Sequence, residues 1–345
     1  MDLSDNQLTA LPAAIGQLTA LKELVLGSNQ LTALPTEIGQ LRALRWLDLS
    51  GNPLEVPPPE VADKGIRAIR DYFRQLEDEG KDYLYEAKLL IVGEAGAGKM
   101  TLARKIQDAN CPLPGEEETT RGIDVGRWDF RMEDGQTFRV NIWDFGGQEI
   151  YHATHQFFLT RRSLYVLVAD ARREDTDFYY WLNLVELLSD NSPLLIVNNV
   201  RGGRQRQIPE RQLRGEFSNL KEVLTTDLAY NPDGLAEVVR EVKHQIVRLP
   251  HVGTGLPKTW TRVRQALETL GETRPYISRD EYLDICRQNG FSRDEDMLQL
   301  SGYLHDLGVC LHYQEDPLLG KTVILKPEWA TGAVYKVLDN PQVQS

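Results

Sequence analysis

The segment Leu89–Ala103, LLIVGEAGAGKMTLA, decides the fold of the central part of this chain. Its apolar start predicts a buried strand, the glycines predict a tight loop, and the residues after them have helical spacing. A GxxxxGK pattern between a strand and a helix predicts a loop whose N–H groups wrap a phosphate chain at the positive end of the helix dipole. The predicted binding residues of this loop are Gly93, Glu94, Ala95, Gly96, Ala97, Gly98, Lys99, Met100 and Thr101.

Two positions of the loop carry most of the chemistry. The ammonium of Lys99 is placed to reach the outer phosphates. The next residue is normally Ser or Thr, because its hydroxyl ligates Mg²⁺, but here it is Met100. Thr101 lies about 100° further round the helix axis, which makes it a poor substitute. We therefore predict phosphate binding with a weakened metal site.

A second motif follows the predicted strand Phe138–Trp143 and reads DFGGQ. In this motif Asp144 would hold Mg²⁺ through a water, Gly147 would bring its N–H to the γ-phosphate, and Gln148 would orient the attacking water. Between the two motifs, Thr120 stands where a mobile loop closes on the metal ion when the γ-phosphate is present. Together these motifs predict a Ras-like domain that hydrolyses GTP, with Gln148, Lys99 and Thr120 as catalytic residues and Thr120 and Asp144 at the metal.

Apolar strands alternate with helical patterns through this part of the chain. This alternation predicts an α/β domain with a doubly wound, mostly parallel sheet covered by helices on both faces. The predicted strands are Lys88–Val92, Val125–Met132, Phe138–Trp143, Ser163–Ala169 and Leu194–Val197, and the predicted helices are Lys99–Asp108, Phe178–Leu188 and Leu235–Leu249.

The N-terminal residues repeat with a period of 23, since Asn6, Asn29 and Asn52 recur in register. This is the pattern of leucine-rich repeats, in which the asparagine satisfies backbone groups in the turn. Stacked repeats need about three or more units to be stable, and this chain has two and a fraction. We therefore expect a partial solenoid that belongs to a longer array and binds a protein partner.

The remaining segments are predicted to be helical, with one two-stranded wing. Glu60–Glu79 has the spacing of a single amphipathic connector helix. Towards the C-terminus, Ser278 with Glu281 and Ser292 with Glu295 match capping boxes. Three helices are followed by a predicted hairpin of Cys310–Tyr313 with Thr322–Leu325, and then by a helix over Glu328–Leu338. This order predicts a winged-helix-like α+β module.

Composition argues against nucleic-acid-binding, membrane-spanning and disulfide-rich classes of protein. A formal charge of −12 opposes general binding to nucleic acid, and the acidic residues of the would-be reading helix oppose it further. No apolar run approaches the roughly 20 residues of a membrane span, and the first residues carry no targeting segment. Three scattered cysteines argue against a disulfide framework. We expect a cytoplasmic protein.

The segments YEAKLLIVGEAGAGK, TTRGIDV and WDFGGQEIYHATHQFFL, beside the repeats, resemble the Roco family. This family joins a Ras-of-complex-proteins (Roc) GTPase domain to a C-terminal-of-Roc (COR) domain. The resemblance implies partial repeats over 1–59, a connector over 60–83, a Roc domain over 84–250 and the first part of COR over 257–345. It also implies slow GTP hydrolysis with GTP/GDP and Mg²⁺ as ligands, homodimers through COR in the longer protein, and a nucleotide state coupled to COR and the repeats.

Two questions stay open from the residues. A guanine reader carries NKxD, whereas this chain has Asn198-Asn199-Val200-Arg201-Gly202. Asn199 is the predicted base-side residue, with Asn198 as the alternative alignment, and the residue in place of the aspartate is then Gly202 or Arg201, neither of which can accept from guanine. Guanine selectivity over adenine therefore rests on the resemblance. The second question is catalysis: the chain is either a GTPase impaired by Met100, or a degenerate nucleotide-binding scaffold whose repeats bind partners.

Overall fold

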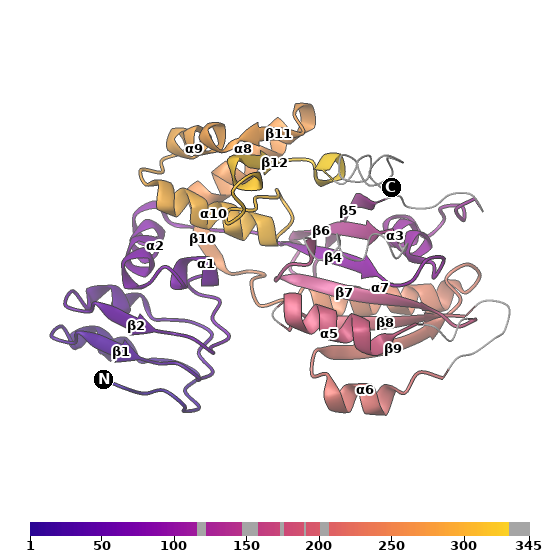
Figure 1. The fold of residues 1–345 in the computed structure, drawn as a ribbon, viewed down its shortest axis with the longest axis horizontal. Coiled ribbons are helices and arrows are strands. Elements are labelled where there is room, and N and C mark those ends of the chain that lie inside the picture. Colours follow the sequence, from indigo (N-terminus) through magenta and orange to yellow (C-terminus); the bar gives the residue numbers. More distant parts are fainter. Residues whose placement is uncertain (116–121, 147–157, 173–175, 190, 201–206, 331–345) are drawn as a thin grey trace. The chain divides into compact units, whose positions relative to one another are not determined.

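The computed structural model describes residues 1–115, 122–146, 158–172, 176–189, 191–200 and 207–330 (Figure 1). Within these residues the chain forms two compact units. Unit 1 comprises Met1–Leu84, Gly253–His305 and Leu311–Leu325, and unit 2 comprises Tyr85–Val252, Asp306–Cys310 and Lys326–Ser345. Both units thus combine segments that are far apart in the sequence.

Unit 2 is built on a mostly parallel sheet. Its strands are β4 (Glu86–Val92), β5 (Ile123–Arg131), β6 (Thr137–Phe145), β7 (Ser163–Asp170), β8 (Leu194–Asn199) and β9 (Leu220–Thr226). In the described residues these six strands lie in the order β5-β6-β4-β7-β8-β9, and all neighbours are parallel except β5, which is antiparallel to β6. Strands β4, β7 and β8 are buried along their whole length, as expected where both faces of a parallel sheet are covered.

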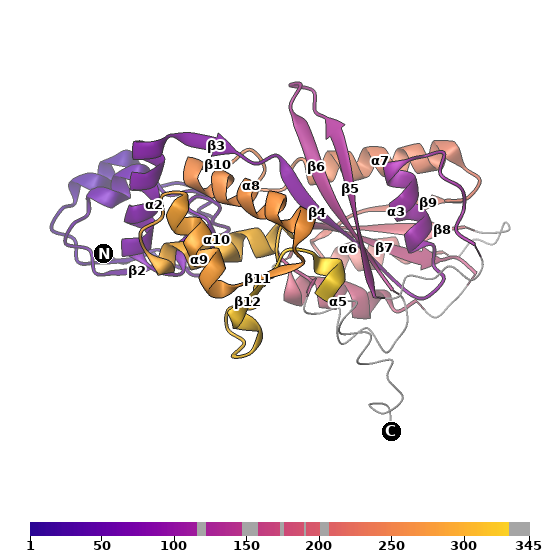
Figure 2. The same cartoon turned by 90° about the horizontal axis from the view of Figure 1, so that it is seen from above.

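Helices cover both faces of this sheet. They are α3 (Lys99–Gln107), α5 (Phe178–Leu188), α6 (Glu210–Glu216) and α7 (Pro232–Ile246). Figure 2 shows α3 and α7 on one side of the sheet and α5 on the other. Leu102 of α3 and Val242 of α7 belong to one core with Ile91 and Val166 of the sheet. Each such buried side chain contributes about 1.5–3 kcal/mol to folding.

The prediction of a doubly wound α/β domain is confirmed. Helix α5 has the predicted bounds, and the strands are found within a few residues of their expected ends. Strand β9 and helix α6 were not predicted. Strand β9 is an edge strand with mixed burial, so its sequence lacks the continuous apolar run that marks β4, β7 and β8.

The N-terminal part of unit 1 is the predicted partial solenoid. Its elements are η1 (Ala13–Gln17), β1 (Glu23–Val25), η2 (Thr36–Gln40) and β2 (Trp46–Asp48), with β1 parallel to β2. The Asn29 amide donates to the carbonyls of Leu3 and Leu26 at 2.9 Å, and its oxygen accepts from the Leu8 N–H at 3.0 Å. Asn52 makes the equivalent bonds one repeat later. The asparagine ladder expected from the sequence is therefore present.

The connector departs from the prediction. The prediction of a single helix over Glu60–Glu79 was wrong, because the chain forms a short helix α1 (Pro59–Ala62) and then a second helix α2 (Ile66–Glu79). Gly65 separates them with φ of +83°, a left-handed conformation that an α-helix does not contain. The apolar residues expected at helical spacing in α2, such as Ile69 and Tyr72, are buried.

The rest of unit 1 is helical with short strand pairs. Its elements are β3 (Lys81–Tyr83), β10 (Gly255–Pro257), α8 (Lys258–Thr273), β11 (Tyr276–Ser278), α9 (Arg279–Gln288), α10 (Asp294–Asp306), η5 (Leu319–Lys321) and β12 (Thr322–Ile324). Strand β3 is antiparallel to β10. The capping box at Ser278 and Glu281 is present, whereas α10 begins one residue later than a cap at Ser292 predicts.

The predicted wing is only partly present. β12 pairs antiparallel with β11, which lies before the second helix, and Leu311 adds a single bridge to Ile324 instead of a strand over Cys310–Tyr313. A strand as short as β11 cannot be recognised from periodicity, since three residues do not define an alternation. The predicted helix Glu328–Leu338 lies mostly outside the described residues. Among those residues, no helix has the length and apolar character needed to cross a membrane.

Candidate functional site

The predicted phosphate loop lies in unit 2, between the end of β4 and the start of α3. Gly93 has φ of +133° and Gly98 has φ of +108°, values that residues with a Cβ rarely adopt. A Cβ on Gly93 would lie 2.3 Å from the carbonyl oxygen of Val168 in β7. The loop is therefore packed directly against the neighbouring strand, and position 93 accepts only glycine.

Lys99 is held inside this loop. Its Nζ donates to the carbonyl oxygens of Gly93 and Glu94, both at 2.8 Å, and the residue is only 6% exposed. Burial lowers the pKa of Lys99 to about 8, and the charges of Asp144 and Glu94 oppose that shift. Within the described residues, the hydrogen bonds of this buried ammonium all go to neutral carbonyls, so an anionic phosphate in the loop would give it stronger partners.

The sheet topology brings the two sequence motifs together. Asp144, which opens DFGGQ, is register-paired with Ile91 on the parallel strand that leads into the phosphate loop. Its side chain is 2% exposed and interacts electrostatically with Lys99. A carboxylate and an ammonium thus stand at the carboxyl end of adjacent strands, where open α/β sheets bind their ligands.

Asn199 joins the loop to the other side of the site. Its Nδ2 donates to the carbonyl of Ala97 at 2.8 Å, and its Oδ1 accepts from the N–H of Leu228 at 3.2 Å. Asn199 ends β8, and Leu228 follows β9, so one buried amide connects three loops. These contacts favour Asn199 over Asn198 as the asparagine of the degenerate NKxD segment.

Two positions of the loop can be compared directly with the sequence prediction. Met100 is half-buried in the first turn of α3, and Thr101 beside it is buried. No hydrogen bond of the Thr101 hydroxyl is present within the described residues. The weakened metal site at Met100 therefore stays a prediction from the sequence.

The predicted residues Thr120, Gly147 and Gln148 lie outside the described part of the chain. The described residues that flank them are adjacent in space, because Ile123 pairs with Phe145 and the Gly146 N–H donates to the Gly122 carbonyl at 2.7 Å. The residue that follows the first predicted switch segment and the residue that precedes the second are therefore bonded to each other beside the paired ends of β5 and β6.

One contact of the loop was missed at the sequence level. Trp181 in α5 donates from its indole N–H to the Glu94 carboxylate at 3.1 Å. Trp181 is buried, and its indole also anchors the phosphate loop to the helix. No spacing rule links positions 94 and 181, so the sequence carries no signal for this bond.

A second buried lysine lies on β4, on the opposite face from the core that contains Ile91. Lys88 Nζ donates to the carbonyl of Phe158 at 2.6 Å and to the Thr160 hydroxyl at 3.2 Å, and lies 3.9 Å from the centre of the Trp143 ring. Burial lowers the pKa of Lys88 to about 7. Its partners Phe158 and Thr160 follow the segment that contains Gln148, so Lys88 fixes the end of that segment to the sheet.

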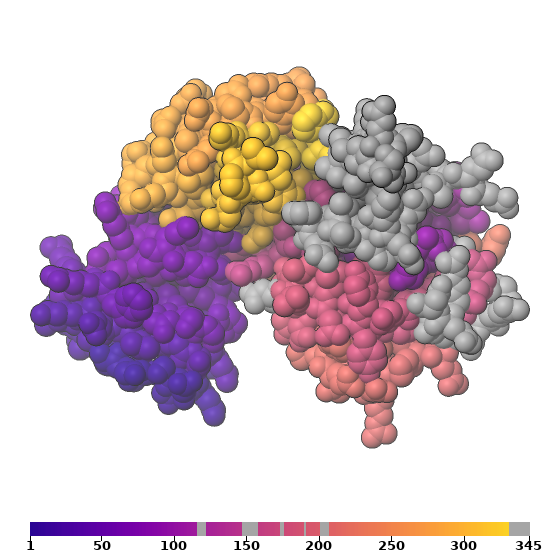
Figure 3. Space-filling model, in the orientation of Figure 1, coloured from indigo at the N-terminus to yellow at the C-terminus, as the bar shows by residue number. Residues whose placement is uncertain are grey.

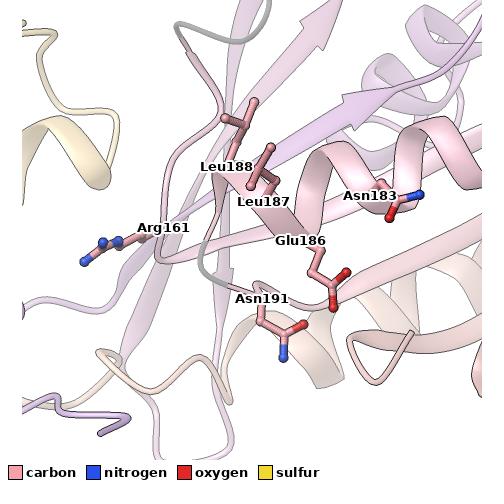
Figure 4. Close-up of a pocket in the computed structure, with 6 residues that line it drawn as sticks. All are labelled: Arg161, Asn183, Glu186, Leu187, Leu188 and Asn191. Carbon is pink, nitrogen blue, oxygen red and sulfur yellow. The ribbon is translucent and has the colours of Figure 1, made fainter. Parts of the chain in front are cut away.

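One surface pocket of unit 2 is separate from the phosphate loop. A surface pocket of about 540 Å³ lies at the end of α5, lined by Arg161, Asn183, Glu186, Leu187, Leu188 and Asn191 (Figure 4). It contains no residue of the phosphate loop and no cluster of metal ligands. Within the described residues of the chain, no group of three His, Cys, Asp or Glu side chains is arranged to hold a metal ion.

Family models match three consecutive parts of the chain. Residues 1–54 match the leucine rich repeat, residues 88–201 match "Ras of Complex, Roc, domain of DAPkinase", and residues 257–345 match "C-terminal of Roc, COR-A domain". These matches agree with the repeats, the loop-bearing sheet and the helical module described above.

Curated relatives and a solved structure agree with these matches. A Roc-COR-CHAT protease of Runella zeae is 27% identical over 75% of this chain, and a probable serine/threonine-protein kinase, pats1, of Dictyostelium discoideum is 27% identical over 81%. The chain spans only 30% and 10% of those proteins. The structure of Methanosarcina barkeri Roco2 RocCORdC bound to GDP is 32% identical, with a TM-score of 0.68, covering 76% of this chain and 79% of that one. The chain therefore belongs to the Roco family, with leucine-rich repeats, a Roc domain and a COR-A domain.

Proposed function

We propose that the Roc domain of this chain is a guanine-nucleotide switch that binds GTP and GDP and hydrolyses GTP slowly. The observation that carries the proposal is the buried Lys99 ammonium, held by loop carbonyls beside Asp144. A nucleotide phosphate would replace neutral carbonyl partners with anionic ones, which strengthens the hydrogen bonds of the ammonium. The GDP in the related Roco2 structure supports a guanine nucleotide as the ligand.

Some of the residues at the phosphate loop are suitable ligands for a magnesium ion, and one is not. The carboxylate of Asp144 is a hard oxygen donor of the kind that Mg²⁺ prefers, and Thr120 would be the second protein ligand. The thioether of Met100 cannot replace a hydroxyl ligand, because sulfur is a poor donor to a hard cation. When bound, Mg²⁺ would neutralise charge that develops on the phosphates. We propose that Met100 weakens this ion and slows hydrolysis.

The chain's own residues would divide the remaining work. Loop N–H groups and Lys99 would bind the phosphates, and Gln148 would orient the attacking water. Asn199 would hold the phosphate loop and the β9–α7 loop in register around the base, through the bonds to Ala97 and Leu228. Trp181 would fix the Glu94 side of the loop.

We also propose that the nucleotide state is coupled to the COR-A domain and the repeats. Support comes from contacts inside unit 2: the Thr160 hydroxyl donates to the Asp306 carbonyl at 3.1 Å, and Arg162 pairs with the Asp306 carboxylate at 3.2 Å. Thr160 and Arg162 follow the segment of Gln148, and Asp306 is the last residue of α10. Movement of that segment would therefore act directly on Asp306. Homodimers through COR in a longer protein, a protein partner on the repeats and a cytoplasmic location complete the proposal.

A fluorescent-nucleotide titration with GDP, GTP and ATP, with and without Mg²⁺, tests the binding step. We expect saturable binding of GDP and GTP and weaker binding of ATP. Loss of saturable GDP binding in Lys99→Ala, with unchanged thermal unfolding, would support the assigned role. If the purified chain binds none of the three nucleotides, the proposal is wrong.

Replacement of Met100 tests the catalytic step. Met100→Thr restores a hydroxyl at the metal position, and we expect GTP hydrolysis to rise by about tenfold, equivalent to about 1.4 kcal/mol of transition-state stabilisation. The control is Met100→Leu, which keeps an apolar side chain and should leave the rate unchanged. Equal rates in all three proteins would refute the role given to this residue.

A catalytically degenerate scaffold is the second candidate function. The specific observation in its favour is the pairing of Met100 with a guanine-reading segment that lacks its aspartate. On this alternative, nucleotide would bind as a structural ligand, and the repeats would bind a protein partner in either nucleotide state. A titration that shows GDP binding, combined with no hydrolysis in either the parent protein or Met100→Thr, would select the scaffold.

A further inference from the structure

A second candidate binding site lies entirely within unit 1. It is a pocket of about 430 Å³ between the connector and the α9–α10 region, whose polar lining includes Lys64, Arg67, Arg279, Arg293, Gln299 and Gln314. We call it the connector pocket. In Figure 3 the violet surface of the connector borders the orange and yellow surface of the helical module. Pockets of this size hold small molecules.

The pocket is rich in cations that lack ion-pair partners. Within the described residues, the side chains of Lys64, Arg67 and Arg279 form neither a hydrogen bond nor an ion pair. Arg293 is different, because it pairs with Asp71 and Glu295. The whole chain has a formal charge of −12, so a cavity lined by three cations without ion pairs is unusual for this protein.

The acidic groups near the pocket do not cancel these cations. Glu295 also lines the pocket, but it is engaged by Arg293, and Glu315 at the rim is exposed. Asp296 is buried and interacts electrostatically with Arg67 and Arg293, although burial raises the pKa of its carboxyl. Lys64 and Arg279 therefore remain available to an anion, and Arg67 is only partly compensated by Asp296.

A buried amide adds a second, independent sign of a ligand. Gln299 on α10 is only 6% exposed and lines the pocket, yet its side chain makes no hydrogen bond within the described residues. Its amide atoms are not among the fully buried polar atoms that lack a partner, so they are open to the space of the pocket, where a ligand can bond to them. His312 in the same wall is already bonded to Ser301 and Gly320, so Gln299 adds an available neutral donor and acceptor to the three cations.

The lining also limits the chemistry of the ligand. The pocket wall contains no Phe, Tyr or Trp on which a nucleotide base could stack. Its combination of cations with a carboxamide matches phosphate groups and hydroxyls, since arginine and lysine bind phosphate oxygens and amides both donate to and accept from hydroxyls. The volume exceeds what inorganic phosphate alone would fill.

We propose that the connector pocket binds a small phosphorylated polyol, with Lys64, Arg67 and Arg279 on its phosphates and Gln299 on a hydroxyl. Lys64 and Arg67 belong to the connector, whereas Arg279 and Gln299 belong to α9 and α10. One bound ligand therefore bridges the connector and the helical module of unit 1. The site is distinct from the phosphate loop and does not depend on the function proposed for it.

Calorimetric titration of the whole chain tests this site, with fructose bisphosphate, inositol trisphosphate and inorganic phosphate as probes, each with and without saturating GDP. We expect one-site binding of at least one polyol phosphate, unaffected by GDP, and at least about tenfold weaker binding of inorganic phosphate. The double variant K64Q/R279Q should weaken polyol phosphate binding by about tenfold or more, and Gln299→Leu should weaken it without a change in its salt dependence.

Arg45→Gln is the matched control, because it removes one exposed repeat arginine that has no ion pair within the described residues. It should bind the probe like the parent protein. The proposal is overturned if neither polyol phosphate binds, if Arg45→Gln loses as much affinity as the pocket variants, or if GDP displaces the probe. Loss of GDP binding with retained polyol phosphate binding would instead count against the Roc proposal and leave the pocket standing.

Discussion

Gly93→Ala is the most direct test of how the phosphate loop is built. The substitution adds one methyl group at a position where φ is +133° and where the new Cβ would lie 2.3 Å from the Val168 carbonyl oxygen. That distance is far inside van der Waals contact, and the atom it meets is backbone of β7, which cannot rotate away. The strand or the loop must therefore shift.

The cost has two parts. A non-glycine residue held in this part of conformational space costs about 1–3 kcal/mol, and forcing an additional methyl group into a packed region costs about 1–3 kcal/mol more. We expect Gly93→Ala to lower the local free energy of unfolding by about 2–6 kcal/mol, out of about 5–15 kcal/mol for a typical domain.

Gly96→Ala provides the matched control. Gly96 has a positive φ of +74°, but a Cβ there would meet nothing within 4 Å. This variant therefore carries only the conformational part, about 1–2 kcal/mol. The difference between the two variants isolates the packing of the loop against β7.

Hydrogen exchange at the amides of β4 and β7 is the assay, because it reports on the sheet and not on the repeats. Fluorescent GDP titration of the same variants shows whether the displaced loop still binds phosphate, and we expect Gly93→Ala to lose most of its affinity. If both variants destabilise the sheet equally, the close approach of Gly93 to Val168 does not contribute to stability, and the argument fails.

Three further predictions follow from buried side chains in unit 2. Burial lowers the pKa of Lys88 to about 7, so between about pH 7 and 10.5 the unfolded chain binds a proton that the folded chain does not, and the free energy of unfolding should rise by up to about 1.4 kcal/mol per pH unit. Urea unfolding at several pH values should show a smaller rise in Lys88→Met, and equal slopes in the two proteins would contradict the assignment. Burial lowers the pKa of Lys99 to about 8, so GDP affinity should be nearly constant below about pH 8 and fall by up to about tenfold per pH unit above it. GDP titrations from neutral to alkaline pH measure this, and an affinity that does not change with pH would contradict it. Asn199→Ala leaves the Ala97 carbonyl and the Leu228 N–H without their partner, so it should cost about 1–3 kcal/mol of stability and speed GDP dissociation, measured by chemical unfolding and stopped-flow release; unchanged release would place Asn199 outside the site.

Local patterns in the sequence were sufficient for the phosphate loop, the repeats and the sheet-forming strands. The turn of GEAGAGK needs positive φ angles at its glycines, and all three, Gly93, Gly96 and Gly98, adopt such angles. The asparagine of each repeat bonds to backbone groups a fixed distance along the chain, so its period predicts its role. Strands buried on both faces of a sheet can be recognised in the sequence as continuous apolar runs.

The errors arose where a single residue or a distant partner overrode the local pattern. The apolar spacing of Glu60–Glu79 continues across Gly65, but the φ angle of that glycine divides the connector into α1 and α2. The wing was predicted as a hairpin because its two segments are close in sequence. Instead β12 pairs with β11, more than forty positions earlier in the chain.

The sequence by itself determined which residues could bind phosphate, and it also exposed the mismatch at Met100. Only the tertiary structure decided that β4 and β6 are neighbours, which sets Asp144 beside Lys99, and that Asn199 and Trp181 reach the loop from other elements. It alone collected Lys64, Arg279 and Gln299 around one cavity. The reason is physical: backbone conformation and periodic burial depend on neighbouring residues, whereas strand order and long-range contacts follow from the packing of the whole unit.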